Sequence, residues 1–363
     1  MLDVILRNVR YRHREGFALR DVTHTFERNT HTAVIGPAGC GGSTLLGVIA
    51  GTLRPESGDV VFGQRRVNDV KPANRPVLHA SAALDVPMRW TVQHALVAAV
   101  RSRSLDRQDR HQEYALAVEK WELGPLVERR IGTLSSTEAA RVHFARIELM
   151  RPAILLADRL LERVSAAARS ALADMLYRIL RVHGTTVIAV PSSYEELAVT
   201  DSVLVLQAGE VLQSGSPAEV FARPAGEAAA VGTGDTDEIP ITIRGNEVES
   251  VIGSWRVDPP PFQGSGVALV RPAHFSPARP GEDSDVIFGV EEAGFSGGRW
   301  IARGVLTGGV TLRIELPGEQ PIHKGRLLAL RYDPTRFTLL PRTSRSLQPT
   351  VPTDVVPPMS ETR

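Results

Sequence analysis

A glycine-rich loop, GPAGCGGST, runs from Gly36 to Thr44. It follows an apolar strand-like run and opens a segment with helical spacing, which is the context that a phosphate-binding loop requires. Its glycines let backbone N–H groups fold around an anion, and the start of the helix adds partial positive charge. The hydroxyl of Ser43 would then ligate a magnesium ion. The alternative is a glycine-rich strand-to-helix turn that binds no ligand.

The same loop departs from the G-x-x-x-x-G-K-[ST] pattern at its lysine, which is Gly42 here. Loss of that ammonium removes a charge-assisted contact to the β- and γ-phosphates of a nucleotide, worth about 1.5–3 kcal/mol. Cys40 has no helper base nearby in the sequence, so we interpret it as a small loop residue rather than a nucleophile. The loop residues expected to contact a nucleotide are Gly36, Gly39, Gly41, Gly42, Ser43 and Thr44.

The segments around this loop alternate between strand and helix patterns. Short apolar runs predict buried strands, and segments with apolar residues at three- and four-residue spacing predict helices. The predicted strands are residues 154–158, 185–190 and 202–207, and the predicted helices lie within 91–130, 137–148 and 166–182. Strands that alternate with helices imply an α/β domain with a largely parallel sheet. We expect this domain to cover residues 1–223.

After Arg223 the composition changes. Residues 224–238, PAGEAAAVGTGDTDE, are small, polar and rich in Gly and Ala, so we interpret them as a linker. From 239 to 342, short alternating segments are broken by Gly and Pro, and helical periodicity is absent, which predicts a small all-β domain. The tail, residues 343–363, is rich in Ser, Thr and Pro and is expected to be disordered.

The overall composition is that of an ordinary globular protein, and it excludes several classes. The 363 residues carry a formal net charge of +1, so no overall field points to nucleic acid or to anionic lipid. The single cysteine excludes an intramolecular disulfide and fits a reducing cytosol, and the ten histidines show no metal-ligand spacing. The N-terminal residues show no signal-peptide pattern, and no apolar run approaches the ~20 residues needed to span a bilayer. We therefore expect a cytoplasmic location, with membrane association only through a partner.

Three separated blocks resemble a known family. GPAGCGGSTLLGVIAGTLRPESGDVVFG (36–63) resembles the phosphate-loop region of the ATP-binding cassettes of bacterial ABC importers. LSSTEAARVHFARIELMRPAILLADRLL (134–161) resembles their LSGGQ signature, its helix and the Walker B strand. DSVLVLQAGEVLQSGSPAEVF (201–221) resembles the segment that closes the domain. The resemblance covers residues 1–223 almost continuously and implies a P-loop NTPase fold with a helical subdomain, and ATP and Mg²⁺ as ligands.

The second domain also has a counterpart in this family. GVALVRPAHFSPA (266–278) and YDPTRFTLLP (332–341) resemble segments of TOBE, an OB-like β-domain that follows the cassette in importers of sugars, polyamines, iron, sulfate and molybdate. The resemblance implies dimer contacts and regulation for this domain. Nothing in its sequence indicates an oxyanion site, because turns explain its Ser, Thr and Gly residues equally well.

The catalytic positions implied by the resemblance are altered. Asp158 fits the Walker B aspartate that holds Mg²⁺. The next position, where the family has the glutamate that acts as general base, is Arg159, which stays protonated and cannot serve as a base. Ser192 stands in place of the switch histidine. Gly42, Arg159 and Ser192 thus form a degenerate set, and general-base catalysis alone is typically worth about 10²–10⁴-fold.

The signature is altered as well, because LSGGQ is LSSTE here. In the family this loop caps the γ-phosphate of the nucleotide bound by the opposite subunit, and its serine is kept as Ser135. The two glycines are Ser136 and Thr137, and the β-branched Thr137 hinders a close backbone approach. Glu138 places a negative charge where the family has a neutral amide.

Four further family features concern the binding of nucleotide or of partner subunits. Tyr11 either occupies the aromatic position that stacks on adenine or is a strand tyrosine that packs at the sheet edge. The Q-loop glutamine is missing, since no glutamine occurs between Gln64 and Gln93, and the D-loop is an unrecognisable ERVS (162–165). A groove beside residues 79–100 receives a short permease helix in the family, and the apolar segment ALDVPMRW (83–90) of this chain serves either docking or plain burial.

We infer from these residues the cassette subunit of an ABC importer that binds nucleotide at most and is defective in ATP hydrolysis, so whether it is an enzyme stays open. It would dock on membrane permease subunits and form a homodimer, or a heterodimer with another cassette, with no nucleic-acid partner. One alternative is an active ABC-transporter ATPase with unusual motifs. Another is a regulatory or ligand-sensing protein that uses the cassette as a dimerisation scaffold. The transported solute is not specified by this chain, because other subunits select it.

A charge count favours retained nucleotide binding. Gly42 removes one positive charge from the site, whereas Arg159 replaces a negative charge with a positive one, so the site gains one positive charge. Ser43 and Asp158 remain to hold Mg²⁺, and the glycines still offer backbone donors. In the competing arrangement, Arg159 forms a salt bridge with Asp158 and closes the site.

Overall fold

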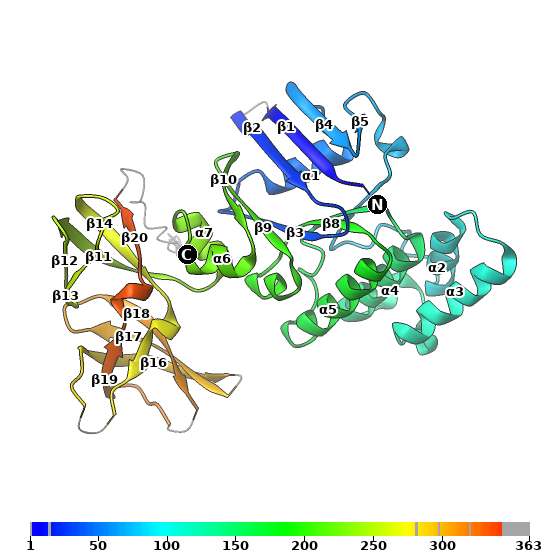
Figure 1. Cartoon of the computed structure of the whole chain (residues 1–363). Coiled ribbons are helices and arrows are strands. Elements are labelled where there is room, and N and C mark those ends of the chain that lie inside the picture. The colour runs from blue at the N-terminus through cyan, green and yellow to red at the C-terminus, as the bar shows by residue number, and fades with distance from the viewer. Residues whose placement is uncertain (1, 14–15, 280–281, 297, 319–320, 343–363) are drawn as a thin grey trace, which may run out of the picture. The chain divides into compact units, whose positions relative to one another are not determined.

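The protein was analysed as a computed structural model, which describes residues 2–13, 16–279, 282–296, 298–318 and 321–342. The chain divides into two compact units, Met1–Asp235 and Thr236–Arg363. The first unit mixes helices and strands, and the second is built from strands (Figure 1). None of the helices in the described part of the chain has the length and apolar character needed to span a bilayer.

A six-stranded sheet forms the centre of the first unit, with the strand order β10-β9-β3-β8-β7-β6. Its strands are β3 (His31–Ile35), β6 (Val77–Ser81), β7 (Ile154–Asp158), β8 (Thr186–Val190), β9 (Ser202–Gln207) and β10 (Glu210–Gly215). β3 pairs in parallel with both β8 and β9, whereas the edge strand β10 is antiparallel to β9. All five residues of β3 are buried, as expected for a central strand covered on both faces.

An antiparallel sheet and the first helix lie beside the parallel sheet in the same unit. The antiparallel sheet has the order β2-β1-β4-β5, with β1 (Val4–His13), β2 (Gly16–Phe26), β4 (Ser57–Phe62) and β5 (Arg65–Arg66). Its inner residues share a core cluster with helix α1 (Gly42–Ala50), to which Leu6 and Ile49 belong. Gly51 in a left-handed conformation, with φ 83°, ends this helix. α1, which directly follows the glycine loop, is therefore anchored in a core that it shares with this sheet.

The other helices of the first unit form a helical subdomain and flank the parallel sheet. They are α2 (Val92–Arg101), α3 (Arg107–Lys120), α4 (Ser136–Met150), α5 (Ala166–Val182), α6 (Pro217–Ala222) and α7 (Glu227–Thr233), with 3₁₀ turns at Pro72–Asn74, Gly124–Leu126, Ile131–Thr133 and Tyr194–Val199. α4 and α5 cover one face of the parallel sheet and α1 covers the other (Figure 1). In the subdomain, Trp121 and Phe144 pack with ring centroids 5.7 Å apart. The helices predicted from apolar spacing are all present.

The second unit consists of two five-stranded sheets with orders β13-β12-β11-β14-β20 and β15-β19-β16-β17-β18. The strands are β11 (Asp237–Arg244), β12 (Glu247–Ser250), β13 (Gly253–Arg256), β14 (Gly264–Val270), β15 (Phe275–Pro277), β16 (Val286–Ser296), β17 (Arg299–Leu306), β18 (Thr311–Pro317), β19 (Leu327–Tyr332) and β20 (Thr338–Pro341), with 3₁₀ turns at Pro272–His274 and Pro334–Arg336. Both sheets contribute to one core, in which Ile241 and Phe288 are buried. β11 buries every second residue, as a strand with one solvated face should.

The predicted fold class, an α/β domain followed by an all-β domain, is confirmed by these two units. The division between them falls after Asp235 rather than after residue 223. The tail expected to be disordered, residues 343–363, lies outside the described residues.

The segment expected to be a linker, residues 224–238, is for the most part a piece of the first unit. Helix α7 occupies its middle, and the side chains of Ala228 and Ala229 are buried in a cluster with Ile35 and Val205 of the parallel sheet. A segment rich in small residues is typical of a flexible linker. Here their small size lets a helix approach the sheet closely, so the linker assignment is corrected.

Candidate functional site

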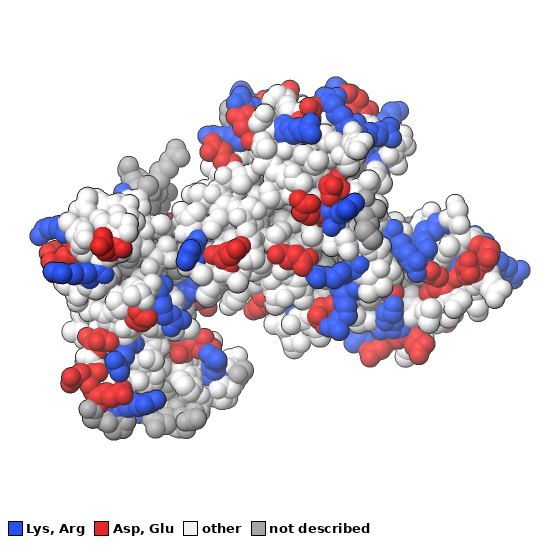
Figure 2. Space-filling model, viewed as in Figure 1, with Lys and Arg blue, Asp and Glu red and all other residues white. Residues whose placement is uncertain are grey.

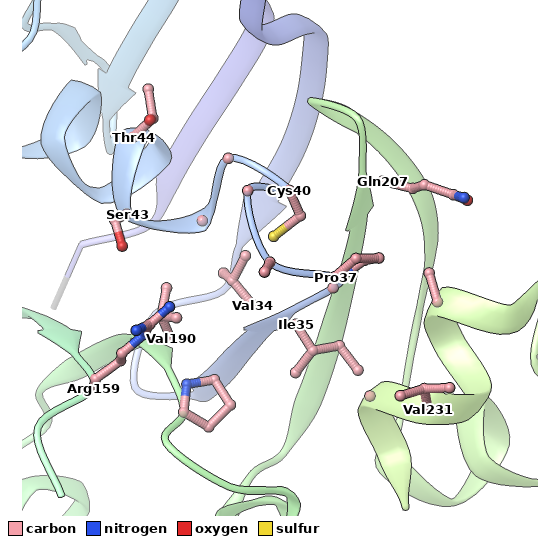
Figure 3. A pocket seen from close by; sticks show the side chains of 18 of the residues that line it. Val34, Ile35, Pro37, Cys40, Ser43, Thr44, Arg159, Val190, Gln207 and Val231 are labelled. Atoms are coloured by element: carbon pink, nitrogen blue, oxygen red, sulfur yellow. The ribbon is translucent and has the colours of Figure 1, made fainter. Parts of the chain in front are cut away.

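A cavity of about 740 Å³ opens beside the glycine loop at the carboxyl ends of the parallel strands. It is lined by residues 36–44, by Arg159 after β7, by residues 191–194 after β8, and by one side of α7 (Figure 3). Ligands of open α/β sheets bind in the crevice outside the carboxyl ends of the strands. The loop that the sequence singles out therefore stands at the place where this architecture holds its ligands.

The glycines of the loop are required by its close backbone contacts. A Cβ atom on Gly36 would lie 2.0 Å from the carbonyl oxygen of Leu206, and one on Gly41 would lie 2.5 Å from that of Ala18. Gly41 also has a φ of 107°, which side-chain-bearing residues rarely adopt. The loop can thus fold tightly against β9 and β2 only because these positions carry no side chain.

Cys40 turns its side chain into the interior of the loop (Figure 3). Burial raises the pKa of its thiol, although backbone N–H groups and the nearby charge of Arg159 oppose that shift. A thiol held neutral in this way is a poor nucleophile. The geometry therefore agrees with Cys40 being a small loop residue.

Ser43 and Asp158, the two residues expected to hold Mg²⁺, meet at the loop. The Ser43 Oγ hydroxyl donates a hydrogen bond of 3.0 Å to Asp158 Oδ1. Ser43 lies in the first turn of α1 and Asp158 ends β7, so the parallel sheet joins residues that are 115 positions apart. Mg²⁺ is typically coordinated by a hydroxyl and a carboxylate of the protein together with phosphate oxygens and water. The types of these two side chains therefore fit that ion. Nowhere in the described chain do three or more His, Cys, Asp or Glu side chains form a group that could hold a metal by themselves.

Arg159 directly follows Asp158 and lines the cavity. Its backbone has a φ of 49°, and its N–H donates a hydrogen bond of 2.9 Å to the carbonyl oxygen of Val190 at the end of β8. Its side chain is 55% exposed and extends toward the glycine loop (Figure 3). The ion pair it forms within the described residues is with Glu162, at 3.9 Å, and not with Asp158. The salt bridge that would close the site is therefore not formed.

Ser192 and Ser193 lie on the cavity wall after β8. The N–H of Ser192 donates a hydrogen bond of 2.7 Å to Oε1 of Glu196, a carboxylate that is only 4% exposed. Burial raises the pKa of Glu196, and the N–H groups of both serines oppose the rise. Among the described residues, the hydroxyl oxygen of Ser193 is buried without a hydrogen-bond partner. The residue in place of the switch histidine thus reaches the site, but it brings no ring that could carry charge.

His13, rather than Tyr11, is the aromatic residue that β1 brings to the cavity. Its Nε2 lies 3.2 Å from Oγ1 of Thr44 in the loop. Tyr11 contacts the His13 ring edge-on at 4.9 Å and packs against the core cluster of the antiparallel sheet. Of the two interpretations of Tyr11, the packed strand tyrosine fits the structure. The signal for His13 was its position two residues further along the same strand, on the same face.

The altered signature, residues 135–138, starts helix α4 and is not among the described residues that line the cavity. Ser135 and Glu138 form a capping box: the Ser135 hydroxyl accepts from the N–H of Glu138, and the Glu138 carboxylate accepts from the N–H of Ser135 at 2.7 Å. Hydrogen bonds from Ser135 lower the pKa of Glu138, and an ion pair of 3.0 Å with Arg129 adds to this effect. Glu138 is therefore occupied in holding the start of its own helix.

Comparison with known proteins agrees with this architecture. A family model described as ABC transporter matches residues 19–160. The sn-glycerol-3-phosphate import ATP-binding protein UgpC of Rhodopseudomonas palustris (strain BisB5) is 30% identical over 249 residues, which cover 68% of each chain. The chain belongs to the ABC transporter family. The cassette predicted from the three sequence blocks is confirmed.

Other relatives of this cassette match it over different lengths. UgpC of Rhodopseudomonas palustris (strain ATCC BAA-98 / CGA009) is 32% identical over 227 residues, so the chain spans only 62% of that relative's length. UgpC of Cereibacter sphaeroides is 27% identical over 327 residues, 89% of this chain and 93% of the relative. The crystal structure of an ABC-transporter cassette in its ADP conformation matches with a TM-score of 0.53 at 20% identity, over 62% of this chain and 96% of that one. The structural match establishes the fold.

Proposed function

We propose that this chain is the ATP-binding-cassette subunit of an ABC importer, and that it binds nucleotide but is defective in ATP hydrolysis. The importer assignment is supported by relatives that are named import ATP-binding proteins, for sn-glycerol-3-phosphate and for maltose/maltodextrin. The defect is supported by Arg159, which lines the cavity at the position of the general base. The placement of Arg159 is the observation that carries the proposal.

Hydrolysis needs a group that accepts a proton from the attacking water. Arg159 stays protonated at any workable pH and cannot do so. Asp158 accepts the Ser43 hydroxyl and is the residue that would hold the metal, and Glu162 is an exposed partner of Arg159 rather than a residue of the cavity wall. Glu227 does line the cavity, but it comes from the start of α7 and not from the end of β7, where the family has its general base. Loss of the general base alone would lower the rate by about 10²–10⁴-fold.

Closure over the terminal phosphate is weakened as well. The signature of the family approaches the γ-phosphate through glycine backbone, whereas this chain presents Ser136 and the β-branched Thr137. The carboxylate of Glu138 caps α4 and pairs with Arg129, so it is held at the surface that would face the partner's nucleotide. A carboxylate accepts hydrogen bonds only, so it cannot donate to phosphate as the neutral amide of the family can.

Nucleotide binding is supported by the parts of the site that remain. The glycine loop keeps its turns, the N-terminus of α1 follows it directly, and His13 stands at the wall beside Thr44. Ser43 and Asp158 remain as the two oxygen-bearing residues that a Mg²⁺ ion would contact. The site residues of this proposal are therefore the loop 36–44, His13, Asp158 and Arg159.

The partners that we propose are membrane permease subunits and a second cassette, with the chain on the cytoplasmic side of the membrane. A dimeric structure of a bacterial ABC-transporter cassette, 20% identical to this chain, shows that this fold can form dimers. In the segment expected to dock, Met88 is 62% exposed and Trp90 is half-buried against His94. Met88→Asp should weaken co-purification with the permease, whereas Leu116→Asp, on another exposed apolar residue of the subdomain, should not. Equal behaviour of the two variants would remove the docking assignment.

The second unit, whose strands run from β11 to β20, is proposed to be the TOBE-like domain. The alignment with a full-length relative extends over 89% of this chain and therefore reaches into this unit. The family resemblance gives such a domain a role in dimer contacts and regulation. The solutes named for the relatives do not fix the solute here, because permease and binding-protein subunits select it.

The test is a paired measurement on the purified full chain. Calorimetric titration with Mg-ATP should show binding, and a phosphate-release assay should show no release above that of the Asp158→Ala variant. Sustained release by the unmodified chain that Asp158→Ala abolishes would overturn the hydrolytic defect. A flat titration would overturn the binding half of the proposal and favour the regulatory scaffold.

A further inference from the structure

The cavity beside the glycine loop carries its own cation. Among its described lining residues, Arg159 and Glu227 are the ones whose type of side chain is ordinarily charged at neutral pH. Arg159 follows the end of β7, and Glu227 starts α7. Asp158 lies one residue before Arg159, so the two opposite charges next to the loop offset each other. The phosphate side of the site is therefore close to neutral before any metal binds.

The backbone of Arg159 is fixed so that its side chain lines this cavity. Its N–H is tied to Val190 of the neighbouring strand at 2.9 Å, and the next two side chains, Leu160 and Leu161, are buried. The side chain extends toward the loop on the side where Ser43 lies (Figure 3). Its contact with Glu162 is a 3.9 Å pair between two side chains that are both more than half exposed. Such a pair contributes little, so an anion in the cavity can compete for the guanidinium.

The described part of the chain offers only two candidate ligands for a metal ion next to the glycine loop. One hydroxyl, of Ser43, and one carboxylate, of Asp158, are hydrogen-bonded to each other at 3.0 Å. Mg²⁺ can use such a pair together with phosphate oxygens and water. A guanidinium on the residue next to Asp158 would repel the ion and at the same time attract the phosphates that the ion would otherwise neutralise.

We propose that this site binds the phosphates of its nucleotide without a divalent cation, with the Arg159 guanidinium and the loop N–H groups supplying the charge and the donors. The inference rests on the proposed nucleotide-binding function. It extends that function, because a phosphate loop that has lost its lysine would otherwise depend more strongly on the metal. Arg159 then has a role of its own in binding, besides removing the general base.

The experiment compares the dissociation constant of ATP in excess Mg²⁺ with that in EDTA, measured on the full chain with a fluorescent ATP analogue and confirmed by competition with ATP. For the unmodified chain the two constants should agree within about threefold. Arg159→Glu should weaken binding in EDTA by about tenfold or more, and Mg²⁺ should recover a large part of that loss, because reversing the charge creates a second carboxylate beside Asp158.

Arg163→Glu is the matched control, because Arg163 is an exposed arginine of the same segment that does not line the cavity. It should leave both dissociation constants unchanged. The side chain of Arg159 is more than half exposed, so its replacement should not unfold the protein, and the thermal midpoint of each variant checks this.

The outcomes separate the two proposals. Binding by the unmodified chain in Mg²⁺ but not in EDTA overturns the metal-independent site and leaves the proposed function standing. Failure to bind under either condition overturns the proposed function and this inference with it. Equal affinity of Arg159→Glu and the unmodified chain in EDTA overturns the role of Arg159 and assigns the phosphates to other groups.

Discussion

Gly36 shows how strongly single atoms control the site. The chain passes so close to β9 at this residue that a Cβ would stand 2.0 Å from the Leu206 carbonyl oxygen, well inside the contact distance of the two atoms. No rotamer can relieve this clash, because the Cβ position is fixed by the backbone and the obstructing atom is also backbone. By contrast, a Cβ on Gly39 would meet no atom within 4 Å.

Gly36→Ala should therefore displace the whole loop, whereas Gly39→Ala should only strain it. We expect Gly36→Ala to lower the free energy of unfolding by about 2–4 kcal/mol and to abolish nucleotide binding. Gly39→Ala keeps its space but must hold a φ of 78°, for which we expect about 1 kcal/mol. Urea unfolding and nucleotide titration of both variants provide the check, and equal losses would contradict the steric argument.

Two buried histidines of the first unit make its stability sensitive to acid. Burial lowers the pKa of His31 and of His143 from 6.5 to about 4. The unfolded chain then binds more protons than the folded one between these values, so the free energy of unfolding falls as the pH drops from 6.5 toward 4. Each group can contribute up to about 3 kcal/mol to that loss.

The His143 contribution can be isolated because both of its ring nitrogens are buried without a partner among the described residues. His143→Leu should lose clearly less stability than the unmodified chain between about pH 7.5 and about pH 5, and its stability at the higher pH should be equal or greater. Urea unfolding at the two pH values measures the difference. An unchanged pH dependence would mean that His143 titrates normally in the folded state.

At this scale the sequence predicted which positions meet at the cavity better than how their side chains lie there. The replaced positions Gly42, Arg159 and Ser192 all line the cavity, because the residues around them fix their register. Of the two interpretations of Tyr11, the structure fits the packed one: Tyr11 and His13 lie on one face of β1, and the path of the backbone brings His13 to the loop. The orientation of Arg159 likewise depends on a hydrogen bond to a strand 31 residues further along the chain, which no local pattern reports.

Among the elements, α1 is the one that couples the loop to the core, and its far end is capped by a buried arginine. Arg75 is 6% exposed, and its guanidinium donates to the carbonyl oxygens of Val48 and Ile49, at 3.1 and 2.7 Å, and to that of Val70 at 3.1 Å. The guanidinium thus serves a carbonyl of the last turn, that of Ile49, and shares the Val48 carbonyl with the N–H of Gly51. A positive charge also suits the negative end of the helix dipole.

Arg75→Met should keep much of the side-chain volume and lose all three hydrogen bonds. We expect the free energy of unfolding to fall by about 2–4 kcal/mol, because buried carbonyl oxygens are left unsatisfied. Arg54→Met is the control: that side chain is 82% exposed and pairs with Asp69 at the surface, so we expect less than about 0.5 kcal/mol. Chemical denaturation of both variants tests this, and similar midpoints would show that the capping contacts are not important.

The start of α4 could have been predicted in more detail from the sequence. The spacing of Ser135 and Glu138, with an apolar helix after them, is the pattern of a capping box, and the structure contains that box. Compared with the LSGGQ signature of the family, the same residues stand out only as replacements. Glu138 is thus unsuited to the family's signature but well suited to capping α4, and the local sequence pattern indicates both.

For the whole molecule, the sequence predicted two domains and their classes, but it misplaced the residues between them. Composition marked 224–238 as a linker because alanine and glycine are abundant there. Tertiary packing overrides that signal: a Cβ on Gly232 would lie 2.8 Å from Cδ1 of Ile35, so α7 approaches the sheet at a distance that only small residues allow. Whether small residues form a spacer or a close contact depends on the surface opposite them, which lies far away in the sequence.

Two fragments distinguish these descriptions. A fragment of residues 1–235 keeps α7, whereas 1–223 lacks it and exposes Ile35 and Val205 to solvent. We expect 1–223 to be less stable by about 2 kcal/mol and to bind nucleotide more weakly, because α7 also lines the cavity. Denaturant midpoints and nucleotide titration of the two fragments measure this. Identical midpoints would show that residues 224–235 are a linker after all.

The charged residues of the whole chain agree with a modest net charge. On the face shown in Figure 2, Lys and Arg side chains are interspersed with Asp and Glu over the first unit and the second, without a large region of one sign. Surfaces of this kind give little long-range attraction for polyanions. The absence of a nucleic-acid partner therefore stays a prediction that surface charge supports.

The position of β3 in its sheet has a consequence for how the protein is made. β3 is complete once residue 35 has been synthesised, but its neighbours β8 and β9 consist of residues 186–190 and 202–207. The hydrogen bond from the His31 N–H to Asp201 spans 170 residues. At about 5–20 residues per second, a ribosome needs roughly 10–30 s to synthesise these intervening residues. The central strand is thus made early and paired late, and the growing chain must keep the apolar HTAVI segment away from other strand edges throughout that interval.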